Sequence, residues 1–481
     1  MLIYVKGFKS SYDIEHLTRL FYPDAAITAN GTHYPKTECV VARKSKNKIM
    51  VGVRTKDKTY VRVGKVNLAE KPSFTASAML YHLLKQITGK RPSWGMLTGV
   101  RPVRLIHDMW AEGKTDAEIS NRFLTSFDVT DEKYKLAMGT AKLQKQVMCG
   151  SNVKSYSLYV SIPFCPSRCS YCSFVSRTTA GSQKLIQPYV DKLCLEIAEI
   201  SRVAQQNDLH LHTIYIGGGT PTALSAAQLR QVMQAIKENF DIARAEEYTV
   251  EAGRPDCTDE EKLSIIKEMG ATRVSINPQT LNDTVLKAIG RRHSVQDVID
   301  CYHIARKLGH NNINMDLIAG LPLDTVDSFA KSLQGVIALA PENITVHTLT
   351  LKRASNLVIE HSPDAYDDVS KMLEYNRLLG QAGYAPYYLY RQKNTLDNLE
   401  NTGFAKPGFE GLYNIYIMEE VHSILSAGAG GVTKLKSPAE NRIERIFNHK
   451  YPLEYTENFA EMLRRKQQIT TFFSQLSENE V

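Results

Sequence analysis

The sequence predicts an α/β protein whose centre is a partial parallel (β/α)6 barrel. Three observations indicate this fold class. Six short apolar segments alternate with helical segments between residues 156 and 349, the region before residue 150 has a different pattern, and a cysteine-rich loop directly follows the first apolar segment. Strands that alternate with helices form parallel sheets, because parallel neighbours need a crossover connection. Enzymes with such sheets place their chemistry beyond the carboxyl ends of the strands.

The alternation defines the expected elements of the central region. The expected strands are residues 156–162, 213–216, 248–251, 273–277, 314–318 and 343–349. The expected helices are residues 187–206, 226–239, 259–269, 294–308 and 325–339. Each helical segment has an apolar stripe at helical spacing, and the strands are short apolar runs.

Two further regions flank this core. Residues 1–150 form an α+β module of unknown role: antiparallel strands are expected over residues 1–65, followed by helices at 73–88, after the capping box Thr115-x-x-Glu118, and at 130–148. The core itself spans residues 151–362. Residues 363–481 are expected to be a mainly helical, family-specific extension with one aromatic strand at 384–390.

Composition and charge limit the possible settings of the protein. No apolar run approaches the roughly 20 residues that a membrane-spanning helix needs. The first residues lack the apolar core of a signal peptide. These features predict a cytoplasmic protein with no membrane partner. The formal net charge is +8, and residues 36–65 contain ten Lys/Arg against two Asp/Glu. This stretch is interpreted as the solvated face of a hairpin, an attractor of an acidic substrate, or a weak nucleic-acid contact.

The eight cysteines divide into five scattered residues and one cluster with the spacing C-x₃-C-x₂-C, formed by Cys165, Cys169 and Cys172. A cluster of this kind in a cytosolic chain indicates a metal site rather than a disulfide framework. Structural zinc needs four ligands, and no other Cys or His lies at ligand spacing beside the cluster. Three thiolates fit a [4Fe–4S] cube that keeps one iron open for chemistry.

A second glycine-rich motif, Gly217-Gly218-Gly219-Thr220-Pro221-Thr222, follows the expected strand at 213–216. Adjacent glycines let the backbone approach a ligand closely. The motif has neither the G-x-G-x-x-G fingerprint nor a P-loop lysine, so it does not indicate a nucleotide phosphate site. A tight turn and a ligand cradle both remain possible on this evidence.

Together, the cysteine spacing and the GGGTPT motif resemble the radical S-adenosylmethionine (SAM) superfamily. Within it, the sequence resembles the oxygen-independent coproporphyrinogen III oxidase family from about residue 156 onward. The N-terminal module and the segment 388–394 resemble the HemZ-type coproporphyrinogen dehydrogenase branch of that family. The motifs that carry this resemblance are Tyr159-Val-Ser-Ile-Pro-Phe-Cys165, Thr249-Val-Glu251, Asn277-Pro-Gln279 through Arg291, and Asp316-Leu-Ile-Ala-Gly-Leu-Pro322.

The resemblance implies two cofactors, a [4Fe–4S] cluster held by Cys165, Cys169 and Cys172 and a SAM molecule that chelates the open iron. It implies no catalytic residue beyond these cofactors. The residues expected to contact SAM are Tyr159, Tyr171, Gly218, Gly219, Thr220, Glu251, Gln279, Arg291 and Asp316. Each polar member of this set also has a structural interpretation, as a helix cap or a packed side chain.

The implied reaction is the oxidative decarboxylation of two propionate groups of coproporphyrinogen III, which yields protoporphyrinogen IX in heme biosynthesis. The anionic tetrapyrrole would suit a basic cleft, for which Arg291, Arg292 and His293 are candidates. An electron donor such as flavodoxin or ferredoxin is a further expected partner, and nucleic acid is not expected.

The sequence also departs from the family pattern. The family members best supported as oxidases carry a further cysteine two residues after the third, where this chain has Phe174 preceded by Ser173. Heme-binding chaperone relatives share this C-x-F ending. The entry-strand histidine of many relatives is Ser161, and Leu323-Asp324 replaces the usual Gly-Gln or Gly-Glu. Two alternatives therefore accompany the oxidase hypothesis: a heme-binding chaperone on the same fold, and an RNA-directed radical SAM enzyme.

Overall fold

A computed structural model describes residues 1–28, 37–67, 70–99, 101–352, 354–359, 366–393, 395–437 and 442–479. Within these ranges the chain folds as two compact units. The first comprises Met1–Ala141, Arg391–Lys393 and Asp397–Leu399, and the second comprises Lys142–Tyr390, Asn394–Leu396 and Glu400–Val481. The expected boundary between residues 362 and 363 lies outside the described residues, and the three-part division stays a prediction.

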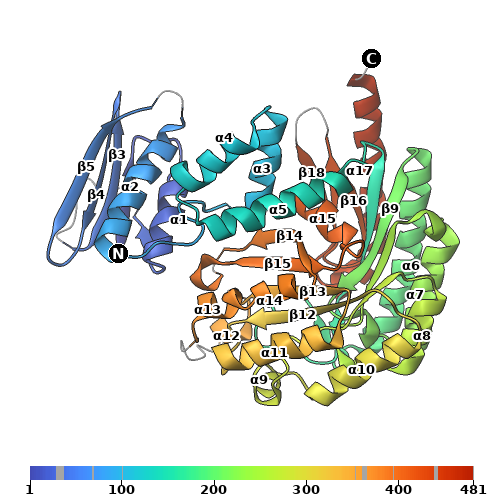
Figure 1. Ribbon diagram of the computed structural model, residues 1–481. Coiled ribbons are helices and arrows are strands. Elements are labelled where there is room, and N and C mark those ends of the chain that lie inside the picture. The colour runs from blue at the N-terminus through green and yellow to red at the C-terminus, as the bar shows by residue number, and fades with distance from the viewer. Residues whose placement is uncertain are drawn as a thin grey trace. The chain divides into compact units, whose positions relative to one another are not determined.

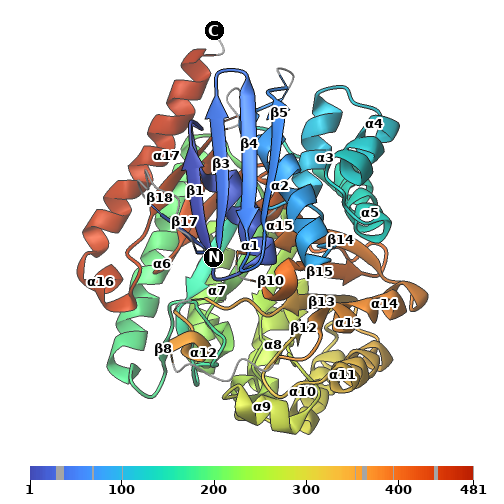
Figure 2. The same ribbon diagram turned by 90° about the vertical axis from the view of Figure 1, so that its left-hand side faces the viewer.

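The first unit contains a five-stranded sheet with the order β2-β1-β3-β4-β5. Its strands are β1 Leu2–Lys6, β2 Ala26–Ile27, β3 Cys39–Ser45, β4 Lys48–Arg54 and β5 Thr59–Lys65. Strands β3, β4 and β5 are antiparallel as expected, but β1 is parallel to both β2 and β3. The expectation of antiparallel strands throughout was wrong because a helix, α1 (Tyr12–Phe21), follows β1 and returns the chain in the same direction. Figure 2 shows this sheet with α1 and α2 behind it.

The remaining helices that begin in the first unit are α2 Pro72–Thr88, α3 Pro102–Ala111, α4 Asp116–Asn121 and α5 Asp131–Met148. Helix α2 ends at Gly89, whose left-handed φ of 68° suits a residue without a side chain. The capping box at α4 is complete: Thr115 N–H donates to Glu118 Oε2 at 2.8 Å, and the Thr115 hydroxyl oxygen accepts from Glu118 N–H at 3.3 Å.

The second unit is built on an eleven-stranded sheet with the order β14-β15-β13-β12-β11-β10-β9-β6-β16-β17-β18. Its six central strands are β6 Ser155–Ile162, β9 His210–Gly218, β10 Glu247–Glu251, β11 Arg273–Ser275, β12 Ile313–Ala319 and β13 Asn343–Thr348. These six strands are parallel to one another and confirm the six expected β/α units. The fold is therefore a partial parallel barrel.

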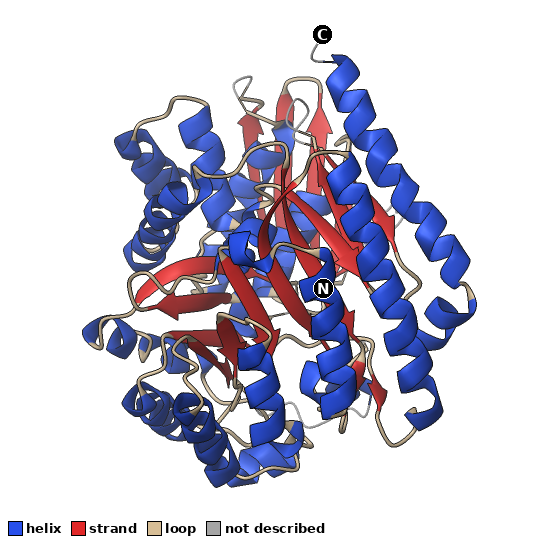
Figure 3. Cartoon of the chain, turned by 90° about the vertical axis from the view of Figure 1, so that its right-hand side faces the viewer, coloured by secondary structure: helices blue, strands red, loops and turns tan. Residues whose placement is uncertain are grey.

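Helices cover the outer side of this sheet (Figures 1 and 3). They are α6 Gln183–Gln206, α7 Ala226–Asn239, α8 Glu260–Glu268, α9 Asp283–Ala288, α10 Val295–Lys307 and α11 Val326–Leu339. Helix α7 packs between α6 and α8, and α8 packs against α10. Ser225 and Ser294 begin α7 and α10 with complete capping boxes, which explains why the sequence located these helices closely.

The region after residue 366 contains more strands than the sequence predicted. Its strands are β14 Ala385–Arg391, β15 Glu400–Ala405, β16 Ser423–Ala427, β17 Val432–Lys436 and β18 Ile443–Phe447. Its helices are α13 Val369–Glu374, α14 Arg377–Gln381, α15 Leu412–Glu419, α16 Pro452–Glu457 and α17 Phe459–Asn479, and α12 Asn356–Ile359 precedes them. Strand β15 is antiparallel to β13, whereas β16 is parallel to β6. This region therefore extends the barrel sheet at both edges.

A buried ion pair fixes the turn after β16. Lys466 Nζ lies 2.8 Å from Glu196 Oε1, and both side chains are fully buried. Glu196 Oε2 also accepts hydrogen bonds from Gly428 N–H at 2.7 Å and from the Tyr455 hydroxyl group at 2.6 Å. Lys466 Nζ donates to Ser426 O at 2.9 Å. Glu196 on α6 and Lys466 on α17 thereby hold the glycine-rich turn at residues 428–431 in place.

In the described part of the chain, no helix is both long and apolar enough to cross a membrane.

Candidate cofactor site

The cysteine loop lies at the carboxyl end of β6. The chain leaves β6 through Pro163 and forms the two-residue strand β7, Phe164–Cys165, which pairs with β8, Arg177–Thr178. Backbone hydrogen bonds tie the loop to two other elements: Ser170 N–H donates to Ile289 O, and Leu357 N–H donates to Ser170 O, each at 3.0 Å. The loop is therefore held between the turn after α9 and the start of α12.

The three cysteines of this loop are unpaired thiols in partly buried surroundings. Cys169 is 8% exposed, and Cys165 and Cys172 are half-buried. Burial raises the pKa of the Cys165 thiol, and a hydrogen bond from Thr220 opposes this effect. Burial also raises the pKa of Cys172, and the neighbouring Cys169 and Cys165 raise it further. The three sulfur atoms therefore interact electrostatically, as expected of thiols that share one site.

The chemistry of the loop fits an iron–sulfur cube. Its three thiols can each bind a different iron of a [4Fe–4S] cube, which leaves the fourth iron open. Among the described residues, no group of three or more His, Cys, Asp or Glu side chains is placed to hold a single metal ion.

The glycine motif at the end of β9 lies against the cysteine loop. Gly219 N–H donates to Ile162 O, and Thr220 N–H donates to Phe164 O, both at 2.8 Å. The Thr220 hydroxyl group lies 3.6 Å from Cys165 Sγ. A Cβ atom on Gly219 would stand 2.6 Å from Phe164 O and 2.9 Å from Cys165 Sγ, which no side chain tolerates. The motif is therefore a close approach between two strand ends, which requires glycine.

Glu251 ends β10 and faces the same region. Its Oε1 accepts a hydrogen bond from the Tyr215 hydroxyl group at 2.5 Å. Burial raises the pKa of Glu251 to about 7; the Tyr215 hydroxyl group and Gly218 N–H lower it, whereas Asp316 raises it. A Cβ atom on Gly217 would lie 3.1 Å from Glu251 Oε2. Glu251 is thus a carboxyl group at the glycine motif, poised to change charge near neutral pH.

Gln279 is hydrogen-bonded to the backbone of β12 next to Asp316. Gln279 N–H donates to Asp316 O at 2.8 Å, and Ile318 N–H donates to Gln279 O at 2.9 Å. Gln279 adopts a left-handed φ of 67° and is 6% exposed. Asp316 lies in the middle of β12. Despite burial, His347 and Asn314 hold the pKa of Asp316 below its usual value.

Arg291 is buried and largely satisfied by protein groups. Its Nη1 donates to Asn277 O at 2.8 Å and to Gly253 O at 3.1 Å, and its Nη2 lies 3.4 Å from the Tyr171 hydroxyl oxygen. Its Nε is buried with no hydrogen-bond partner among the described residues. That orphaned donor fits a ligand group. Arg292 is exposed whereas His293 is buried, so the three residues expected to form a basic cleft do not share one surface.

Tyr159 belongs to an aromatic stack that the sequence did not reveal. Its ring centroid lies 6.2 Å from those of both Tyr215 and Tyr413, at interplanar angles of 22° and 15°. The Tyr215 and Tyr413 rings are 4.4 Å apart. Tyr413 comes from α15, more than 250 residues after β6, and no sequence pattern joins the two. The stack forms one wall beside Glu251.

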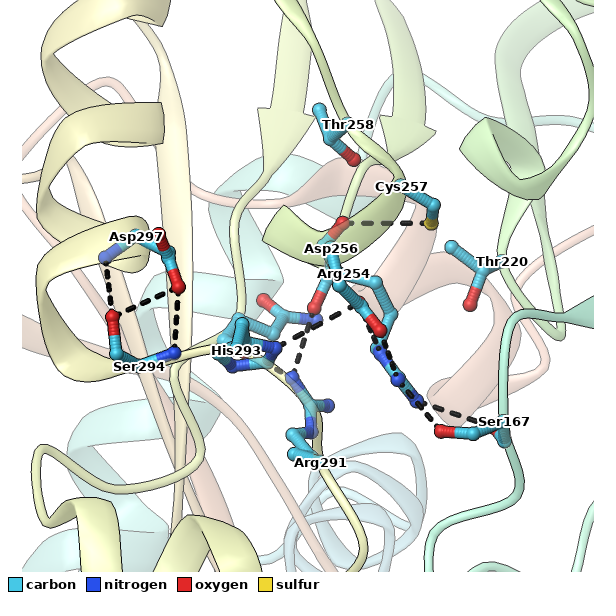
Figure 4. Close-up of polar contacts among 12 residues, drawn as sticks. Ser167, Thr220, Arg254, Asp256, Cys257, Thr258, Arg291, His293, Ser294 and Asp297 are labelled. Atoms are coloured by element: carbon cyan, nitrogen blue, oxygen red, sulfur yellow. Dashed lines mark hydrogen bonds and ion pairs between the residues drawn. The ribbon is translucent and has the colours of Figure 1, made fainter.

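Sequence reasoning also missed the roles of Arg254 and Asp256 and the location of His293. Figure 4 shows these three residues grouped beside Ser167 of the cysteine loop. Arg254 Nη1 lies 3.4 Å from Cys169 Sγ. One sequence signal could have identified Arg254: it lies only three residues after Glu251, at the carboxyl end of a predicted strand, where the site was expected. Of the twelve residues expected to bind the cofactors, the structure brings Cys165, Gly219 and Thr220 into one contact group. It places Tyr171 beside Arg291 and Gly218 beside Glu251, and joins Gln279 to Asp316.

The sequence of this protein is similar to those of several known proteins. The radical SAM superfamily model matches residues 159–334. The protein is 38% identical over 405 residues to the oxygen-independent coproporphyrinogen-III oxidase-like protein HemZ of Bacillus subtilis, which covers 82% of this chain and 81% of that protein. It is 33% identical over 285 residues to the heme chaperone HemW of Lactococcus lactis, covering 58% and 70% of the two chains.

A solved structure is also similar. The coproporphyrinogen III oxidase HemN of Escherichia coli, a radical SAM enzyme, matches with a TM-score of 0.52 and 26% identity over 67% of this chain and 73% of that chain. The strand order, the cysteine loop and these similarities agree. The chain belongs to the radical SAM superfamily, whose cofactors are a [4Fe–4S] cluster and S-adenosylmethionine, and within it to the family of oxygen-independent coproporphyrinogen-III oxidase-like proteins.

Proposed function

We propose that this protein catalyses the oxygen-independent oxidative decarboxylation of coproporphyrinogen III to protoporphyrinogen IX. The observation that carries the proposal is the meeting of the cysteine loop, the glycine motif and Glu251 at neighbouring strand ends of one sheet. This is the arrangement that a cluster and a chelated SAM require together. The similarity to HemZ along 82% of the chain supports the choice of substrate.

In this proposal the three cysteines hold the cluster, and nine residues position SAM. When bound, the cluster and SAM supply one-electron chemistry that abstracts a hydrogen atom. Gly218, Gly219 and Thr220, which lie beside the cysteine loop, accommodate the amino end of SAM. The other polar groups of SAM are held by Glu251, Gln279, Arg291 and Asp316, and the two flanking aromatic residues are Tyr159 and Tyr171.

The protein also has to keep water from the reacting centre and bind an anionic substrate. The stacked rings of Tyr159, Tyr215 and Tyr413 form an apolar wall that excludes water beside Glu251. Carboxylates of the tetrapyrrole need accessible cations, and of the three candidates only Arg292 is exposed. An external one-electron donor of the flavodoxin or ferredoxin type would reduce the cluster.

A specific observation favours a second candidate function, heme carriage. Phe174, two residues after Cys172, is 67% exposed. Lys352 Nζ lies 5.8 Å from the centroid of its ring. An exposed aromatic face beside a cation suits a flat tetrapyrrole with carboxylate groups. The similarity to HemW supports this candidate.

An anaerobic assay separates the two functions. The reconstituted protein is mixed with SAM, a low-potential reductant and coproporphyrinogen III, and tetrapyrrole products are separated by chromatography. Formation of protoporphyrinogen IX over several turnovers supports the decarboxylase. Stoichiometric heme binding, with no product and with a fully loaded cluster, contradicts it and supports the carrier. Phe174→Ala should weaken heme binding in the carrier and leave cluster content unchanged in both.

A further inference from the structure

Arg254 is a buried cation beside the cysteine loop. It follows β10 and immediately precedes the helical turn Pro255–Cys257. Its side chain is 4% exposed and points toward the loop that carries Ser167 and Cys169 (Figure 4). Burying a charged group without compensation is costly, so its partners indicate what it does.

Every N–H of this guanidinium group has an acceptor. The group carries five N–H donors in a planar fork. Nε donates to Asp256 Oδ1 at 2.9 Å, and Nη2 donates to Asp256 Oδ2 at 2.6 Å and to Ser167 Oγ at 2.9 Å. Nη1 donates to Ser167 O at 3.2 Å and to Cys169 Sγ at 3.4 Å. Four of the five bonds therefore fix the plane of the group, and the fifth is directed at the sulfur.

The carboxylate that orients Arg254 is itself held in its charged form. Burial would raise the pKa of Asp256, but His293 and Arg254 outweigh burial and hold it below its usual value. His293 Nδ1 lies 3.7 Å from Asp256 Oδ1. The ion pair therefore persists throughout the neutral pH range, and the orientation of the guanidinium group does not depend on pH there.

The contact with Cys169 is suited to a specific task. We infer that Arg254 is a positioning residue that donates an N–H···S hydrogen bond to Cys169 and thereby raises the reduction potential of the [4Fe–4S] cluster. Hydrogen bonds to ligand sulfurs are one of the determinants of cluster potential. A donor and a positive charge stabilise the reduced cluster more than the oxidised one, because reduction adds one negative charge.

The reaction concerned is a one-electron reduction of the cluster by an external low-potential carrier, with no bond or proton transferred. The inference rests on the proposed ligation of the cluster by Cys169, but not on the identity of the tetrapyrrole or on decarboxylation. The test therefore omits both SAM and tetrapyrrole. A purely structural role, in which Arg254 only ties Ser167 to Asp256, would leave the potential unchanged once the cluster is loaded.

The first measurement is a redox titration of the reconstituted protein, followed by electron paramagnetic resonance of the reduced cluster. Arg254→Gln should shift the potential negative by an amount equivalent to tenfold weaker reduction, about 59 mV for one electron. Arg254→Lys keeps the charge and should shift it less. Arg230, on α7, makes a two-point pair with Glu268 at 2.8 Å and serves as the matched control. Arg230→Gln should leave the potential unchanged.

The second measurement is made on the wild-type protein, so it does not depend on whether Arg254→Gln retains its cluster. Wild-type protein labelled with guanidino-¹⁵N arginine should show a weak nitrogen coupling to the reduced cluster in pulsed electron paramagnetic resonance. Arg254→Lys, which keeps Arg291, should lose that coupling, and Arg230→Gln should keep it. If Arg254→Gln does not retain its cluster, this measurement decides the question.

An unchanged potential in Arg254→Gln with a full cluster overturns the inference, and so does the absence of nitrogen coupling in the wild type. A full cluster in Cys169→Ala would overturn the ligation on which the inference rests. A potential shift and a coupling in a protein that makes no protoporphyrinogen would support the inference and contradict only the proposed reaction.

Discussion

The hydroxyl group of Tyr215 donates a hydrogen bond of 2.5 Å to Glu251, and this bond opposes the burial that raises the pKa of the carboxyl group to about 7. Burial thus brings the pKa of Glu251 close to neutral pH, and the hydrogen bond favours the ionised form. An ionised carboxylate is a stronger hydrogen-bond acceptor for the amino group of SAM than a neutral carboxyl group is. Tyr215 thus favours the form of Glu251 that would bind the cofactor.

The first prediction concerns the pH dependence of SAM binding. Affinity should rise by about tenfold per pH unit below the pKa and level off above pH 7, because one proton must leave Glu251. Equilibrium dialysis with labelled SAM on cluster-loaded protein measures this. Glu251→Gln should bind weakly with a flat profile. Tyr215→Phe should move the rise to higher pH. A wild-type profile that is flat between pH 6 and 8 would contradict the assignment.

The raised pKa of Glu251 also affects folding stability, which should fall as the pH rises, whereas SAM affinity should increase. The folded pKa of Glu251 is raised above the usual value of a glutamate side chain, so the folded state holds a proton that the unfolded chain releases. The contribution of Glu251 to stability is therefore present at low pH and is lost as the pH rises through about 7. Urea unfolding of cluster-free protein at pH 5 and pH 8 should show a smaller loss of stability for Glu251→Gln than for the wild type.

The second prediction concerns the cluster ligands. Cys169→Ala should abolish the broad absorbance near about 400 nm that iron–sulfur clusters show and should lose most of the bound iron. Cys194, on α6, is a half-buried thiol outside the loop and gives the matched control. Cys194→Ala should keep both signals. Iron and sulfide analysis after anaerobic reconstitution measures the difference, and retention of about four irons per chain in Cys169→Ala would contradict the ligand assignment.

The third prediction concerns the close approach at Gly219. Alanine there would force a methyl group against Phe164 O and Cys165 Sγ, so the cysteine loop must move. Gly219→Ala should lower the free energy of unfolding by about 1–3 kcal/mol and reduce cluster occupancy. Gly380→Ala, in α14, meets open space and should be neutral or slightly stabilising. Equal cluster occupancy in both variants would contradict the prediction, because it would show that the ends of β6 and β9 can move apart without loss of the cluster.

The fourth prediction concerns the buried pair of Glu196 and Lys466. Lys466→Met removes one partner and leaves an unpaired buried carboxylate, which should cost about 3–5 kcal/mol of unfolding free energy. The exposed pair of Arg230 and Glu268 is the control, and Arg230→Ala should cost about 1 kcal/mol or less. Urea titration of the two variants measures both values. If Lys466→Met is as stable as Arg230→Ala, the pair does not fix the turn after β16.

Much of the central fold could be predicted because its signals are local. Ser225 and Ser294 mark helix starts, and the apolar runs mark the six central strands of the large sheet. The cysteine spacing and the strand-end position of Glu251 also pointed to the site. Each of these inferences needed only a few consecutive residues.

The missed features depend on residues far apart in the chain. Strand β16 pairs with β6 across more than 260 residues, and the short strands after residue 400 carry no strong alternation of their own. The stack of Tyr413 on Tyr159 also joins two residues that are far apart in the sequence. Arg254 resembles an ordinary loop residue until Cys169 is placed beside it. Only tertiary packing makes these contacts, so local patterns do not contain them.

The pairing of β6 with β16 has a consequence for synthesis of the protein. During translation β6 obtains its first neighbour, β9, after about fifty further residues, whereas β16 emerges only near the end of the chain. Until then the strand that leads into the cysteine loop has one unprotected edge, which favours aggregation. A ribosome-stalled or C-terminally shortened chain would present this edge permanently.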